Sequence, residues 1–135
     1  MNFNYKAKII SFSILIIFLF CLYIIGSCKN CFETVDVKKF EELIKEDKVT
    51  ILDVRTENEF KSGHIEKAIN IDYYSEDFIK KCKDTLDKNN TIAIYCQSGS
   101  RSKESAKLLT KENFTVINLN GGMDNWKKYN KKTVK

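Results

Sequence analysis

The sequence predicts an α/β fold in which a parallel β-sheet is covered by helices on both faces. Short apolar runs rich in β-branched residues alternate along the chain with segments whose apolar residues recur at helical spacing. Strands separated by helices pair in parallel through crossover connections, so this alternation indicates a parallel sheet. The length of 135 residues, with 43% hydrophobic residues, 30% charged residues and no proline, fits one domain and excludes a globally disordered chain.

The first 27 residues are typical of a targeting segment. Two lysines without an acid are followed by an uncharged stretch over residues 9–25, as in a secretory signal. The segment IGSC at 25–28 resembles a bacterial lipobox, which implies cleavage before Cys28 and a diacylglycerol on its sulfur. We expect a lipoprotein signal peptide or an uncleaved membrane anchor over 1–27, and a tether over 28–35.

This start of the chain predicts where the protein resides. Lipid chains on Cys28 would hold it stably on a membrane, so we expect an extracytoplasmic, membrane-anchored protein of a bacterial cell envelope. The alternatives are an ordinary signal peptide, or a transmembrane anchor followed by Cys28 and Cys31 as a C-x-x-C pair, which alone predicts no redox or zinc site. The net charge of +5 is not gathered into a basic tract, so nucleic acid is not an expected partner.

The domain is expected to begin with a helix over 36–46, because Asp36 is a suitable N-cap and apolar residues follow at helical spacing. The run VTILDV at 49–54 is apolar and β-branched, which is typical of a strand buried on both faces. A short helical turn is expected over 59–63, where Gly63 ends it.

The same alternation continues beyond this turn. Apolar β-branched runs mark strands, and polar turn residues or a glycine pair separate them from helices. The expected elements are a strand at 68–71, a helix at 75–86 capped by Ser75, a strand at 91–96, a helix at 100–113, a strand at 115–119 and a short helix carrying Trp126. The domain is therefore expected over 36–130, with a tail at 131–135.

Cys96 is the residue at which chemistry is expected. It ends the strand 91–96, and sites in open parallel sheets lie beyond the carboxyl ends of strands. The loop between this cysteine and the next helix consists of Gln97, Ser98, Gly99, Ser100 and Arg101. Such a loop points its amide N–H groups inward at the positive end of the helix dipole. Both features favour the thiolate, which is the nucleophilic form of cysteine.

Four motifs, taken together, resemble those of a single-domain rhodanese, a sulfurtransferase. They are DVR at 53–55 with Glu59-Phe60, GHI at 63–65 with AINI at 68–71, CQSGSRS at 96–102, and LNGGM at 119–123 with Trp126. The resemblance covers nearly all of residues 33–130 and implies a rhodanese-like domain with about five parallel strands. One departure is Glu66-Lys67, where the family carries small residues; it predicts a bulky cation near the mouth of the loop.

The resemblance also implies a reaction. The Cys96 thiolate would take sulfane sulfur from thiosulfate or a persulfide donor, while the loop amides stabilise the anion and the Cys96 persulfide. A thiol acceptor, which can belong to a protein, would then remove the sulfur. The expected partners are these donors and acceptors and the membrane, and neither a metal nor an organic cofactor is expected.

The rare residues agree with this interpretation. The chain has many lysines but only two arginines, and both lie within the motifs. Arginine offers a planar fork that lysine lacks. We expect Arg55, supported by Asp53, to pair with Glu59 or with the loop, and Arg101 to brace the loop or to meet an anionic substrate. His64 is expected to be a turn residue rather than a base.

Two alternative functions remain at this point. Phosphatases and arsenate reductases also place a cysteine and an arginine around an anion, but such phosphatases separate the two by five residues. Four residues separate Cys96 from Arg101 here, and the shorter loop favours sulfur. The other alternative is a membrane-tethered binding module that has the fold without the chemistry.

Overall fold

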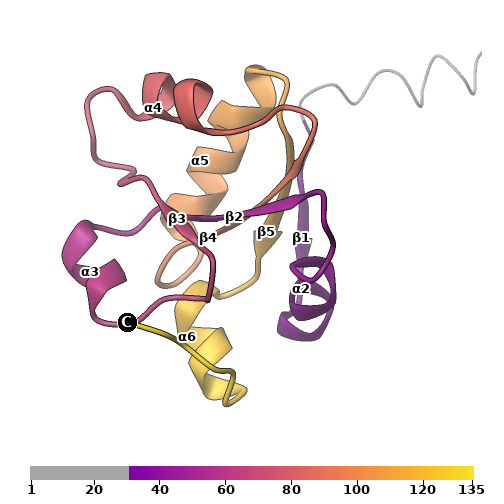
Figure 1. Ribbon diagram of the computed structural model, residues 1–135, viewed down its shortest axis with the longest axis vertical. Coiled ribbons are helices and arrows are strands. Elements are labelled where there is room, and N and C mark those ends of the chain that lie inside the picture. The colour runs from indigo at the N-terminus through magenta and orange to yellow at the C-terminus, as the bar shows by residue number, and fades with distance from the viewer. Residues whose placement is uncertain (1–30) are drawn as a thin grey trace, which may run out of the picture.

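A computed structural model describes residues 31–135 of the chain (Figure 1). The expected signal or anchor segment and the expected lipidation site Cys28 lie outside the described residues. Within residues 31–135, no helix has the length and apolar character that a membrane span requires.

A five-stranded parallel sheet forms the centre of the fold, which confirms the predicted class. The strand order is β1-β5-β4-β2-β3. The strands are β1 (Glu33–Val35), β2 (Val49–Asp53), β3 (Ile69–Asn70), β4 (Thr91–Tyr95) and β5 (Thr115–Leu119). Asp53 at the end of β2 pairs with Tyr95 at the end of β4, so the residues that follow these two strands meet at one edge of the sheet.

The sheet begins earlier in the chain than the apolar pattern indicates. Residues Glu33–Val35, assigned above to the tether, form an edge strand that pairs with Ile117–Leu119 of β5. Only Val35 of this strand is buried. Three residues with one buried side chain carry too little pattern for a strand prediction, and the pairing comes from the free edge that β5 offers.

The C-terminal residues also belong to the folded unit. Val134, in the segment assigned above to a tail, forms an antiparallel bridge with His64. The Trp126 indole N–H donates to the carbonyl of Lys132 at 3.0 Å. Trp126 is buried and meets the Phe40 ring edge-on with centroids 6.3 Å apart, so it packs the C-terminal part of the chain into the core.

Within residues 31–135, five helices occur in the predicted order between and after the strands. They are α2 (Val37–Leu43), α3 (Glu57–Lys61), α4 (Phe78–Thr85), α5 (Ser100–Lys111) and α6 (Gly122–Lys128). Asp36 caps α2 as predicted, because its carboxylate accepts a hydrogen bond from the Lys39 N–H at 2.8 Å. The expected cap of α4 by Ser75 is wrong: residues 75–78 form a turn, and the helix begins after Asp77.

Helix α3 begins earlier than expected, at Glu57, because Thr56 and Glu59 form a capping box. The Thr56 N–H donates to the Glu59 carboxylate at 2.9 Å, and the Thr56 side chain accepts from the Glu59 N–H. This local motif fixes the Glu59 side chain at the start of a short helix.

Two apolar clusters pack on opposite faces of the sheet. Helices α4 and α5 cover one face, and α2 and α6 cover the other, as Figure 1 shows at the top and bottom of the view. Cys82 of α4 lies fully inside the first cluster, where burial raises the pKa of its thiol to about 12.

Candidate active site

Cys96 directly follows β4 and is 1% exposed. Its sulfur accepts a hydrogen bond from the Gly99 N–H at 3.1 Å. Gly99 has a φ of +99°, a left-handed conformation that glycine adopts without strain, and it is the N-cap of the 12-residue helix α5. The loop thus folds back over the sulfur and brings it to the positive end of a helix.

The first turn of α6 holds the loop from its other side. The Met123 N–H donates to the Cys96 carbonyl at 2.8 Å, and the Asp124 N–H donates to the Gln97 carbonyl at 3.0 Å. Gly122 permits this close approach, because a Cβ there would lie only 2.3 Å from the Cys96 carbonyl oxygen. The glycine pair was expected only to break the chain. Gly122 also allows the loop to pack closely against α6.

Arg55 is buried behind the loop. Its guanidinium donates to both carboxylate oxygens of Asp53 at 2.7–3.0 Å and to the Gly63 carbonyl at 2.9 Å. A further N–H donates to the Gln97 side-chain oxygen at 3.2 Å, which provides the expected contact with the loop. Burial is the largest single influence on the pKa of Arg55 and lowers it, but the hydrogen bonds and the charge of Asp53, with a contribution from Tyr95, together outweigh burial and raise the pKa, so the arginine keeps its charge.

Arg101 takes the partner that was expected for Arg55. Its guanidinium donates to the two oxygens of Glu59 at 2.7 and 2.8 Å, so the expected pairing of Arg55 with Glu59 is not formed. These hydrogen bonds lower the pKa of Glu59 to about 2. They also raise the pKa of Arg101, with smaller contributions from the charges of Glu59 and Cys96. Arg101 is 17% exposed and lies over the Tyr74 ring, 5.6 Å from its centroid.

Asp124 is a residue of the site that sequence reasoning missed. Its carboxylate accepts a hydrogen bond from the Gln97 side-chain N–H at 2.6 Å, so Gln97 is held between Asp124 and Arg55. An acidic residue in the first turn of a helix is common because it complements the helix dipole. The sequence therefore offered no signal that this carboxylate contacts the loop.

The remaining expected residues lie around or away from the sulfur. Ser98 and Ser100 are exposed on the loop. His64 stacks on the Phe60 ring at 3.7 Å, and its Nδ1 lies 3.1 Å from the Phe60 carbonyl oxygen, which fits its expected place in a turn. Within residues 31–135, no three His, Cys, Asp or Glu side chains gather in a way that could hold a metal ion.

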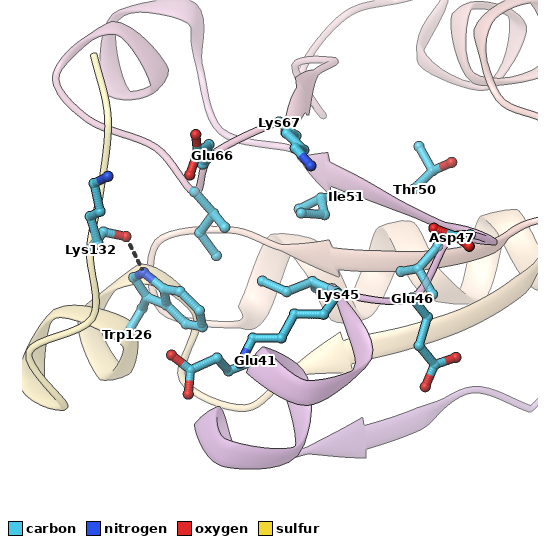
Figure 2. Close-up of a pocket in the computed structure, with 13 residues that line it drawn as sticks. Glu41, Lys45, Glu46, Asp47, Thr50, Ile51, Glu66, Lys67, Trp126 and Lys132 are labelled. Atoms are coloured by element: carbon cyan, nitrogen blue, oxygen red, sulfur yellow. Dashed lines mark hydrogen bonds between the residues drawn. The ribbon is translucent and has the colours of Figure 1, made fainter.

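A cavity of about 650 Å³ lies apart from the loop (Figure 2). The end of α2, the first part of β2 and residues 65–67 line it, and none of residues 96–101 does. Figure 2 shows Lys67 on one side of this cavity and Glu41 and Lys45 on the other. The expectation that Lys67 lies near the mouth of the loop is therefore wrong, because residues 65–67 face the middle and start of β2 rather than its end.

The fold and this cysteine loop define a class: α/β domains that hold a cysteine after a central strand, in a loop that leads into a helix N-terminus and donates a backbone amide to the sulfur. The family model described as the rhodanese-like domain matches residues 36–129. The chain therefore belongs to the rhodanese-like domain family.

Individual relatives agree with this assignment. "Rhodanese-like domain-containing protein 17" of Arabidopsis thaliana is 32% identical over 105 residues, covering 69% of this chain and 67% of that protein. "Putative sulfurtransferase YtwF" of Bacillus subtilis is 31% identical over 86 residues, covering 64% of this chain and 81% of that protein. Some relatives are longer: the chain spans 30% of a tRNA uridine(34) hydroxylase of Acinetobacter baylyi, with 34% identity over 94 residues and 66% of this chain covered.

A solved structure has the same fold. The rhodanese-related protein of Thermoplasma volcanium superimposes with a TM-score of 0.69 at 26% identity, covering 76% of this chain and 98% of that one. The similarity extends over 98% of that chain, so the five-stranded unit described above has a counterpart in a solved rhodanese-related structure.

Proposed function

We propose that the protein is a sulfurtransferase in which Cys96 carries the transferred sulfur. The observation that carries this proposal is the hydrogen bond from the Gly99 N–H to the Cys96 sulfur, inside a loop that opens helix α5. Amide donors and the helix dipole stabilise negative charge on that sulfur, and the thiolate is the nucleophile in sulfur exchange. A relative named as a sulfurtransferase supports the same activity.

The reaction has two steps. The Cys96 thiolate attacks the outer sulfur of the donor, the sulfur–sulfur bond of the donor breaks, and the leaving group departs with the electron pair, as sulfite does from thiosulfate. An acceptor thiolate then attacks the outer sulfur of the Cys96 persulfide and regenerates the Cys96 thiolate. The loop amides stabilise the persulfide anion between the steps.

The surrounding side chains act as positioning residues. Arg55 and Asp124 hold Gln97 from two sides, and Gln97 follows Cys96 directly, so they fix the start of the loop. Glu59 holds Arg101 at the end of the loop through two hydrogen bonds. Because Cys96 is only 1% exposed, the outer residues of the loop must give way slightly around an approaching donor.

Intact-mass measurement after exposure to thiosulfate tests the proposal. We expect an adduct of about 32 Da, the mass of one sulfur atom, that a reducing thiol removes. The adduct should be absent in Cys96→Ser and present in Cys82→Ala, a matched variant at the second buried free thiol within residues 31–135. An adduct that survives Cys96→Ser would remove Cys96 from the reaction.

A rhodanese-like binding module without catalysis is the second candidate, and two observations favour it. Cys96 is almost fully buried, and the fork of Arg101 is already occupied by Glu59. A folded protein that gains no sulfur from thiosulfate, a thiosulfonate or a persulfide would support this candidate.

A phosphatase is less favoured, because the occupied arginine fork and the short loop leave no receptor for a tetrahedral phosphate. We therefore expect no turnover of phenyl phosphates.

We also propose that the protein is an extracytoplasmic lipoprotein of a bacterial envelope, anchored through Cys28. The basic and apolar regions followed by IGSC at 25–28 support this location. The intact mass of the protein extracted from membranes would identify its first residue and its acylation. A chain that retains residues 1–27 would indicate an uncleaved anchor instead.

A further inference from the structure

We propose that the site selects a sulfane-sulfur donor with a single negative charge on its reacting group, such as an organic thiosulfonate or persulfide, over the doubly charged thiosulfate ion. This inference rests on the proposed sulfur transfer and names the substrate class of the same site. It comes from how the charged side chains around the Cys96 loop are already paired.

Both arginines beside the loop are neutralised by the protein itself. Arg55 is 1% exposed and bonded through three contacts to the Asp53 carboxylate. Arg101 lies closer to the surface, but Glu59 occupies its fork with two short hydrogen bonds. A donor therefore meets no unpaired guanidinium, and a dianion would have to displace Glu59 to gain one.

Asp124 adds a carboxylate on the other side of the loop. Its hydrogen bonds join it to Gln97, which is neutral, and no ion pair within residues 31–135 includes it. The two arginine–carboxylate pairs sum to zero charge. Asp124 therefore makes the net charge of the side chains around the loop negative, even before the Cys96 thiolate is counted. The positive potential that a donor meets comes from the loop amides and the start of α5.

This arrangement discriminates by charge. The repulsion between a donor and the two anions Asp124 and Cys96 grows in proportion to the charge on the donor. Amide dipoles can stabilise one developing negative charge, as in an oxyanion hole, but they offer a dianion no counter-ion. Tyr74 is 67% exposed beside Arg101 and presents an apolar face that an organic group on the donor can contact, whereas thiosulfate has no such group.

The chemistry balances for a singly charged donor. The Cys96 thiolate attacks the outer sulfur of methanethiosulfonate, a new sulfur–sulfur bond forms, and the bond between the donor sulfurs breaks. Methanesulfinate leaves with the electron pair, and the persulfide anion stays on Cys96. Thiosulfate reacts in the same way with sulfite as the leaving group, so the two donors differ by one charge and by a methyl group in place of an oxygen anion.

The test compares these two donors on the full chain with cyanide as the acceptor. Each kcat/KM is divided by the rate of the same donor with a free small thiol, which removes the intrinsic reactivity of the donor. We expect the normalised value for methanethiosulfonate to exceed that for thiosulfate by about tenfold or more. Added KCl should raise the thiosulfate value more steeply, because salt screens repulsion.

Substitutions of the carboxylates around the loop test which side chains produce the preference between the two donors. Glu59→Gln keeps an oxygen for the Thr56 N–H but removes the charge that neutralises Arg101, and it should shift the donor ratio toward thiosulfate by about two- to tenfold. Glu57→Gln is the matched control, because it removes a carboxylate from the same helix that is paired with Lys61 away from the loop. Asp124→Asn should shift the donor ratio in the same direction. It provides a second test of the charge effect if Glu59→Gln folds poorly.

The outcomes separate this inference from the proposed function. A normalised preference of the wild-type protein for thiosulfate would overturn the inference while leaving sulfur transfer intact. The same holds if the donor ratio is equal in Glu59→Gln and Glu57→Gln and is also unchanged in Asp124→Asn. If neither donor places sulfur on Cys96 in the folded wild-type protein, the proposed function itself fails.

Discussion

Two arginine–carboxylate pairs flank the cysteine loop, and they differ in depth. Arg55 and Asp53 are 1% and 0% exposed, whereas Arg101 and Glu59 are 17% and 32% exposed. The buried pair comes from one strand end and lies behind the loop, while the outer pair joins residues 42 apart in sequence at the rim. Similar ion pairs can therefore differ in role: the inner pair stabilises the framework behind the loop, and we propose that the outer pair sets the charge that a sulfur donor would meet.

The largest effect should come from breaking the inner pair. Asp53→Asn leaves the Arg55 charge buried without its counter-ion, so we expect the free energy of unfolding to fall by about 3–5 kcal/mol. Glu59→Gln should cost about 1 kcal/mol or less, because partly exposed pairs contribute little. Urea unfolding of both variants measures the difference. Equal losses would show that depth does not separate the two pairs.

Exchange of each arginine for lysine should affect the inner pair more than the outer pair. Lysine cannot reproduce the fork by which Arg55 contacts Asp53, Gly63 and Gln97 together. Loss of a hydrogen bond from a charged group costs about 1.5–3 kcal/mol, so Arg55→Lys should lower sulfur-transfer kcat/KM by about tenfold or more. Arg101→Lys can still pair with Glu59 and should lower it less. Steady-state rates with methanethiosulfonate would check both variants, and a larger loss in Arg101→Lys would contradict the prediction.

The smallest effect concerns acid stability. Hydrogen bonds from Arg101 lower the pKa of Glu59 from its ordinary value near 4.5 to about 2 in the folded state. The stability from this shift is fully present above about pH 5 and is lost as the pH falls toward 2, because the unfolded chain takes up the proton first. After solvent screening we expect roughly 1 kcal/mol. Urea unfolding at pH 6 and pH 3 should show this loss in wild type and a smaller one in Glu59→Gln.

The central framework was predictable because its signals are local. The runs that form β2, β4 and β5 are apolar and β-branched. The bounds of these strands lie within one residue of the expected positions. The place of Cys96 between a strand and a helix follows from the same local pattern. Strand β1 was not predictable, because its three residues carry almost no pattern and depend on the edge of β5.

The pairing around the loop could not be predicted for a related reason. Both arginines and Glu59 lie in the motifs, but which arginine binds Glu59 depends on how α3 and α5 meet across the edge of the sheet. The contact of Asp124 with Gln97 likewise joins residues 27 apart. Sequence spacing identifies such residues as candidates, and only the folded arrangement assigns their partners.

The direction of β1 has a consequence for a protein held on a membrane. All the strand pairs of the sheet are parallel, so the start of β1 lies at the edge opposite to the one where Cys96 follows β4. A molecule attached by its N-terminal end would enter the sheet at the near side of the domain. Under the proposed membrane attachment, Cys96 would then lie at the edge of the sheet opposite to the attached end of the domain.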